Sequence, residues 1–202
     1  AAGGLGFDTQ WDAAFFHPVD ETILARNDSD RRMGAIRAAL EHKYNGHSSE
    51  RVIYTESHDE VANGKQRIPE MISPGDAGSY VARKRSTLGA IVLMTAPGIP
   101  MLFMGQEFLE SGYFADTRPL DWSKTSRYAG ILRLYTDLIH LRRNSEGKTG
   151  GLLSDKVYVY HVNDSAKVIA YRRWQDGGIG DDVIVVMNFS GRAFPVYNVG
   201  LP

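Results

Sequence analysis

The chain has 202 residues, of which 43% are hydrophobic and 23% charged, an ordinary composition for a globular protein that buries a core. Lys and Arg number 23 against 24 Asp and Glu, so the net charge of -1 provides no broad basic surface for a nucleic acid. The absence of cysteine excludes disulfide frameworks, thiolate nucleophiles and zinc–thiolate sites, and it fits a cytoplasmic protein.

Neither a membrane span nor a signal sequence is evident. The longest nearly apolar stretch, residues 88–104, is interrupted by Pro97, Gly98 and Pro100, and it is shorter than the ~20 residues that a transmembrane helix needs. Residues 1–4 include no initiator methionine, no basic start and no apolar signal core. We therefore expect no membrane partner, and we expect the chain to be part of a longer protein.

Residues 1–145 alternate short apolar runs with segments of helical period, which is typical of a parallel-sheet β/α protein. A candidate strand covers residues 5–12. Polar caps at residues 28–30 then begin a helix that Gly46 ends. Its apolar face consists of Met33, Ile36, Leu40 and Tyr44.

The next elements repeat the same alternation of strand and helix. A buried strand covers residues 51–55, a helix runs over residues 79–95 until Pro97, and a second strand covers residues 100–104. A long amphipathic helix follows, with Arg142 and Arg143 suited to its negative C-terminal end. Its predicted core face consists of Ile131, Leu134, Tyr135, Leu138 and Leu141.

From residue 148 the hydrophobic period changes from helical to two. Strands over residues 157–162 and 168–174, joined by a turn at residues 163–165, predict an antiparallel hairpin, and the apolar run 183–189 predicts a central strand. We expect two domains, residues 1–145 and residues 146–202. Three parallel strands are too few for a native sheet, so the first domain is expected to be part of a larger β/α barrel or open sheet.

Polar residues cluster directly after two of the expected parallel strands. Glu56, His58, Asp59 and Glu60 follow the strand that begins at residue 51, and residues 105–107 follow the next strand. In β/α folds, functional side chains lie where strands end and loops begin. The two segments therefore predict a site for a polar, uncharged ligand such as a sugar.

Other interpretations of these residues remain open. A His–Asp pair is often only a surface or capping feature. Adjacent His and Asp also bind metal ions in some phosphohydrolases, but the remaining histidines show no ligand-like spacing with them; these are His17, His42, His47, His140 and His161. Four aromatic residues lie in loop-like segments where rings can stack on sugars, although core packing is the usual role of any one of them: Trp11, Tyr113, Phe114 and Trp122.

Three motifs together resemble the α-amylase superfamily. They are residues 57–60 after a buried strand, residues 95–108, and residues 119–122, and residues 3–12 resemble a further barrel strand. Within the superfamily, the sequence most resembles bacterial 1,4-α-glucan branching enzymes, because Ser57 stands where the superfamily usually has Asn and Glu60 follows Asp59. The resemblance implies an α/β fold: strands six to eight of a (β/α)8 barrel followed by a C-terminal antiparallel β domain.

The resemblance also implies roles for particular residues. Asp59 would be the carboxylate that stabilises the transition state, with His58, Glu60, Gln106 and Glu107 contacting an α-1,4-glucan substrate. The nucleophile and the general acid belong to the fourth and fifth barrel strands, which this sequence does not contain, so we expect the 202-residue chain alone to be inactive. Neither a cofactor nor a metal is implied, and exposed sheet edges favour self-association.

Three alternative functions remain at this point, one of them the metal-dependent phosphohydrolase named above, which would show chelator-sensitive activity on phosphate esters. Another is an α-amylase-type hydrolase, in which water replaces the acceptor hydroxyl of a glucan. The third is a non-catalytic glucan-binding module, which would bind maltooligosaccharides without turning them over.

Overall fold

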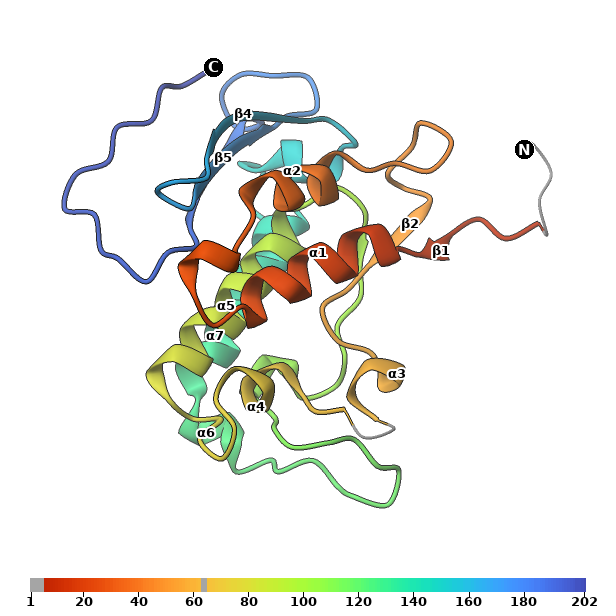
Figure 1. Ribbon diagram of the computed structural model, residues 1–202. Helices are drawn as coiled ribbons and strands as arrows, with labels where there is room; N and C mark the ends of the chain where they lie inside the picture. Colours follow the sequence, from red (N-terminus) through yellow and green to blue (C-terminus); the bar gives the residue numbers. More distant parts are fainter. Residues whose placement is uncertain (1–5, 63–64) are drawn as a thin grey trace.

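The computed structural model describes residues 6–62 and 65–202 (Figure 1). Two three-stranded sheets, one parallel and one antiparallel, lie on different sides of a layer of helices. The helices and strands are β1 Gln10–Trp11, α1 Ala13–Leu24, α2 Met33–Glu41, β2 Arg51–Ile53, α3 His58–Val61, α4 Ile68–Ile72, α5 Tyr80–Thr95, β3 Ile99–Pro100, α6 Lys124–Arg127, α7 Ala129–Arg142, β4 Val157–Asn163, β5 Val168–Arg173 and β6 Val183–Asn188.

The first sheet is parallel, with strand order β1-β2-β3. Strands β1 and β2 lie within the predicted ranges but are shorter, since β2 ends at Ile53 rather than at residue 55. The prediction of a strand over residues 100–104 is wrong in its bounds: β3 covers Ile99–Pro100 and shares only Pro100 with it. Beyond Ile53 the side chains of Thr55 and Glu56 form hydrogen bonds to Gln106 and to the Ile68 N–H, in neighbouring segments of the chain. Leu5, the expected start of the first strand, lies outside the described residues, as do residues 3 and 4 of the motif that resembles a barrel strand.

Helix α1 was not expected from the sequence. Asp12 caps it, since its Oδ1 accepts hydrogen bonds from the backbone N–H groups of Ala14 (2.9 Å) and Phe15 (3.3 Å). Phe15, Val19 and Ile23 repeat every four residues and are buried on one face. The cap and this spacing were available as signals, but Pro18 in the middle of the segment obscures the pattern.

Helix α2 is shorter than predicted, running from Met33 to Glu41 instead of from residue 28 to Gly46. Residues 28–30 form a separate 3-10 turn, because Asp28 pairs with Arg31 (2.6 Å) instead of capping the helix. Met33, Ile36 and Leu40 are buried as expected, whereas Tyr44 lies in a turn beyond the helix, where it bridges to His47.

A buried ion pair connects β1, β2 and α2. Arg51 is completely buried, and its Nη1 donates to Asp12 Oδ2 at 3.1 Å and to the Ala39 carbonyl at 2.8 Å. Its Nη2 donates to the carbonyls of Leu40 (3.3 Å) and Pro97 (2.6 Å). One guanidinium therefore connects the sheet to the end of α2 and to the turn after α5.

Helices α5 and α7 pack against each other through Ala90, Met94, Tyr135 and Leu138. Arg142 was expected to interact with the C-terminal end of its own helix; instead it donates to the carbonyls of Ala96 and Gly98, because these face it from the turn before β3. Leu141, expected in the core, is 46% exposed.

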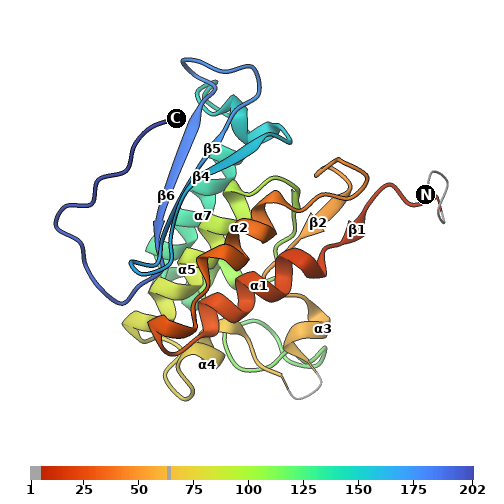
Figure 2. The ribbon, with the colours of Figure 1, turned by 45° about the horizontal axis from the view of Figure 1, so that its top comes forward.

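The second sheet is antiparallel, with order β4-β5-β6, and it confirms the predicted hairpin. The apolar run 183–189 does form a strand, but its predicted central position is wrong: among the described residues β6 pairs only with β5 and lies at the edge of the sheet, while β5 is central. A register shift between Val159 and His161 marks a bulge in β4. Figure 2 shows this sheet on one side of the helices, with the segment after β6 running away from the body.

The two sheets share one hydrophobic core. The cluster contains Phe15, Ile53 and Val92 from the β/α part together with Ile169 and Tyr171 of β5, all with at most 1% exposure. The Tyr171 hydroxyl also forms a hydrogen bond with the Thr95 hydroxyl of α5. The division into domains at residue 146 stays a prediction. None of the helices in the described part of the chain has both the length and the apolar composition needed to cross a bilayer.

Candidate functional site

The carboxyl ends of β1 and β2 carry an aromatic and a polar group side by side. Trp11 is the last residue of β1 and is 44% exposed. Its ring centroid lies 5.2 Å from that of Tyr54 and 6.0 Å from that of His58, which it meets edge to face. Because parallel strands end at the same edge of a sheet, this edge gathers residues that lie more than forty positions apart.

The four residues from His58 to Val61 form a single helical turn, α3. Ser57 caps it by accepting a hydrogen bond from the Glu60 N–H at 3.3 Å, and Val61 is buried beneath it. His58 and Asp59 therefore point outward, with side chains 59% and 65% exposed. His58 Nε2 lies 3.2 Å from Asp59 Oδ1, so the two groups are available together to a ligand.

Glu60, the third predicted site residue of this turn, is paired within the protein. Its Oε2 lies 2.7 Å from Lys65 Nζ, and its side chain is 23% exposed. The hydrogen bond that Lys65 Nζ donates to Glu60 raises the pKa of Lys65, which keeps the ammonium charged. Glu60 therefore ties Lys65 to α3.

Glu56, the remaining carboxylate of the cluster, faces the interior. It accepts hydrogen bonds from the Ile68 N–H (2.7 Å) and from Arg67 Nη1 (3.3 Å). Arg67 also donates to the Met104 carbonyl at 2.9 Å and lies over the Phe103 ring, 4.8 Å from its centroid. Burial raises the pKa of Glu56 to about 7, against the opposing effect of Arg67. The Glu56–Arg67 pair therefore fixes the segment that precedes α3 against residues 67, 68 and 104.

Gln106 and Glu107 follow β3 as expected, and both have bonds inside the protein. Gln106 Nε2 donates to Thr55 Oγ1 at 2.9 Å, while its Oε1 accepts from the Phe103 N–H at 2.8 Å. The Gln106 amide thus joins the ends of β2 and β3, with one N–H left over. Glu107 accepts from the Gly105 N–H at 2.9 Å within its own turn.

Asp20 of α1 is a half-buried carboxyl, with one enclosed oxygen, that the sequence analysis did not single out. Its Oδ1 has no hydrogen-bond partner among the residues that the structure describes. Burial raises its pKa to about 7, and the charges of Glu56 and Glu60 add to the effect. Reasoning from the sequence missed Asp20 because helix α1 itself was not expected.

No three His, Asp or Glu side chains within residues 6–62 and 65–202 come together as a metal site. Of the predicted residues, the structure brings His58 and Asp59 together at the surface and adds Trp11 beside them. It ties Glu60, Gln106 and Glu107 into local hydrogen bonds. Trp11 was recognisable only as one of several aromatic residues in loop-like segments.

Comparisons with curated proteins find similarity along almost the whole chain. It is 30% identical over 210 residues to a 1,4-alpha-glucan branching enzyme of Pseudomonas fluorescens, which covers 99% of this chain and 26% of that protein. A branching enzyme of Dechloromonas aromatica is 31% identical over 217 residues, covering 99% and 32%. The chain thus spans between a quarter and a third of the length of these relatives. No protein-family model matches it.

Solved structures share the fold. A pullulanase from Anoxybacillus complexed with maltotetraose aligns with a TM-score of 0.69 at 22% identity, covering 95% of this chain and 31% of that one. A putative alpha amylase from Salmonella typhimurium aligns with a TM-score of 0.67 at 16% identity, covering 96% and 42%. Sequence and fold similarity thus confirm the resemblance carried by the strand-end motifs. The chain is similar over almost its whole length to curated branching enzymes, and it shares the fold of solved enzymes titled pullulanase and alpha amylase.

Proposed function

We propose that this chain is the C-terminal portion of a 1,4-α-glucan branching enzyme, acting on an α-1,4-glucan in the cytoplasm in glycogen synthesis. The observation that carries the proposal is the exposed His58–Asp59 pair at the carboxyl edge of the parallel sheet. The similarity of nearly the whole chain to curated branching enzymes supports it. Branching cuts an α-1,4 bond and passes the glucan chain to a 6-hydroxyl of another chain.

Asp59 is assigned the role of transition-state stabiliser. Its carboxylate accepts hydrogen bonds from sugar hydroxyls, and these strengthen as positive charge develops on the ring. His58, 3.2 Å away, is assigned to the same sugar as a hydrogen-bonding partner. The nucleophile and general acid of a retaining transfer are assigned to barrel strands outside residues 1–202.

Three neighbours support this pair in different ways. Trp11 is assigned as a stacking platform, because its half-exposed ring lies against His58 at the same edge. Gln106 holds the ends of β2 and β3 together, and its free amide N–H is assigned to substrate. Glu60 and Glu107 are assigned to the border of the proposed glucan site, where their carboxylates accept hydrogen bonds from glucan hydroxyls.

The proposed architecture follows from this assignment. The strands β1, β2 and β3 would be strands six to eight of a (β/α)8 barrel, with residues 146–202 as the beginning of a C-terminal β domain. The parallel order of the three strands and the change to antiparallel pairing at β4 support this. Self-association of the isolated chain through the edges of the parallel sheet is proposed on the same basis.

The test is Asp59→Asn in the intact protein. We expect kcat on amylose to fall by about 100-fold, ~3 kcal/mol of transition-state stabilisation, with little change in KM. Asp137→Asn on α7, also exposed, is the matched control. Branching is followed by the shift in iodine colour and the gain of α-1,6 linkages. Unchanged kcat in the variant would refute the assigned role, and a rise in reducing sugar would indicate hydrolysis instead.

A further inference from the structure

A cavity of about 570 Å³ lies between α5 and the segment that follows β6. Four cationic side chains line it, Arg31, Lys84, Arg85 and Arg192, and no carboxylate is among its described lining residues. The rest of the wall is mixed: the ring of Tyr80, which is 67% exposed, on one side and Ser190 on another. The volume is in the range of small-molecule sites.

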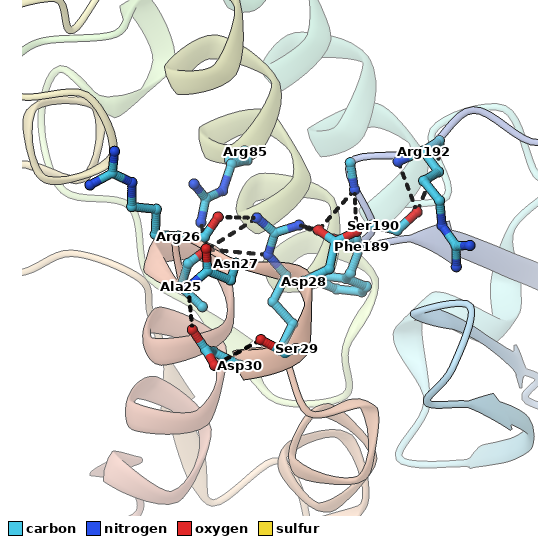
Figure 3. A network of polar contacts seen from close by, with 12 residues as sticks. Ala25, Arg26, Asn27, Asp28, Ser29, Asp30, Arg85, Phe189, Ser190 and Arg192 are labelled. Atoms are coloured by element: carbon cyan, nitrogen blue, oxygen red, sulfur yellow. Dashed lines mark hydrogen bonds and ion pairs between the residues drawn. The ribbon is translucent and has the colours of Figure 1, made fainter.

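Two guanidinium groups converge at the base of this cavity. Arg31 donates from Nη2 to the Ala25 carbonyl at 3.1 Å, and Arg85 Nη2 donates to the same oxygen. Figure 3 shows this network, with Arg85 of α5 on one side and Arg192 on the other. Arg31 is 7% exposed and also donates to the Phe189 carbonyl at 2.6 Å. Two like charges are therefore held close together in partly buried surroundings.

The nearest carboxylate does not balance this charge. Asp28 Oδ1 accepts from Arg31 Nη1 at 2.6 Å, and both Asp28 oxygens accept from the Gly191 N–H, at 3.0 and 2.9 Å. Asp28 thus pairs with Arg31 and with no other cation of the wall. The net charge of the whole chain is only -1, so this cavity is a local concentration of positive charge.

Three of the four cations retain unused hydrogen-bond donors. Arg85 Nε is buried without a partner among the described residues. Lys84 and Arg192 form no ion pair with any carboxylate in the described ranges 6–62 and 65–202, and both are exposed. Arg192 Nη2 donates to the Ser165 carbonyl at 3.1 Å, which leaves its other N–H groups for a ligand. Buried donors without acceptors cost free energy, which a bound anion recovers.

We propose that this cavity binds a phosphate-bearing small molecule, a sugar phosphate or a nucleotide. Three cations with free donors suit a phosphate, which has two charges and three oxygens, better than they suit the single charge of a carboxylate ligand. The exposed ring of Tyr80 offers a face for a sugar or a base. Figures 1 and 2 show the segment after β6 on the side of the molecule away from α3, so the proposal stands independently of the glucan site.

The experiment is calorimetric titration of the intact protein at low ionic strength with ATP, glucose 1-phosphate and inorganic phosphate. We expect at least one organic phosphate to bind, and the double variant Lys84→Gln/Arg192→Gln to weaken that binding about tenfold or more. Both side chains are exposed, so the variant is expected to keep the wild-type unfolding midpoint. Arg133→Gln on α7, 83% exposed, is the control and should bind as the wild type does.

The three probes distinguish the source of the phosphate. Tighter binding of ATP indicates a nucleotide, and tighter binding of glucose 1-phosphate indicates a sugar phosphate. The proposal is overturned if no organic phosphate binds at millimolar concentration, if inorganic phosphate alone binds, or if the double variant and the wild type bind equally.

Discussion

Replacing Asp20 by Asn tests the electrostatics beneath the site. Burial raises the pKa of this carboxyl from 3.8 to about 7, and nearby Glu56 and Glu60 reinforce the shift while Lys65 opposes it. The folded state therefore holds the Asp20 proton more tightly than the unfolded state does. The free energy of unfolding must then decrease as the pH rises from about 4 through about 7, because ionising the carboxyl costs more in the folded protein.

The size of the effect follows from the shift. The rise from 3.8 to about 7 is about three pH units, which corresponds to at most ~4 kcal/mol at pH values above 7. Asn has nearly the same shape as a protonated Asp and carries no charge at any of these pH values. Asp20→Asn should therefore leave stability nearly unchanged at pH 4 and increase it by up to ~4 kcal/mol at pH 8.

Urea unfolding of the intact protein at pH 4, 6 and 8 measures this difference. Asp137→Asn, on the exposed face of α7, is the control and should show no pH-dependent change. Glu56→Gln separates the contribution of Glu56, whose pKa is raised to about 7 by burial. If the stability of Asp20→Asn falls between pH 4 and pH 8 as steeply as that of the wild type, Asp20 does not titrate as inferred.

Two further substitutions test the packing. Arg51→Met leaves Asp12 buried without its cation and should lower the free energy of unfolding, measured in urea, by ~3–5 kcal/mol. Arg37→Met, at an exposed position, should change it by less than about 0.5 kcal/mol. Equal effects of the two variants would show that the buried pair is unimportant. Gly151→Ala places a Cβ 2.5 to 2.6 Å from backbone atoms of Arg173, Asp181 and Trp174 and should lower the free energy of unfolding by ~1–3 kcal/mol. Gly34→Ala meets no atom within 4 Å and should stabilise α2 instead, so a harmless Gly151→Ala would contradict the close approach.

The sequence predicted the elements whose periodicity is clear. Helix α5, with Ser79 before it and Pro97 after it, and the hairpin of β4 and β5 lie close to the expected bounds. It could not predict helix α1, because Pro18 interrupts its pattern, or the early end of β2. Local signals specify caps and alternation, whereas strand ends depend on distant partners.

The candidate site was predictable only in part for the same reason. Density of polar residues after a strand identified residues 56–60, but it could not separate the inward Glu56 from the outward Asp59. That separation depends on Arg67 and Ile68, which lie farther along the chain. Trp11 and Asp20 join the region only through the fold, so no spacing within the sequence connects them to His58 or Glu56.

The core shared by the two sheets limits how this part of the protein can be exchanged. Ile169 and Tyr171 of β5 pack in one cluster with Phe15 and Val92, so the antiparallel sheet and the helices α1 and α5 share buried surface. In a chimaera joined near residue 146 with a relative of about 30% identity, the β5 side chains of one protein would pack against the helix side chains of the other, and the two sets would not be matched in shape. Exchange of this sheet between relatives therefore requires replacing the facing positions of α1 and α5 at the same time.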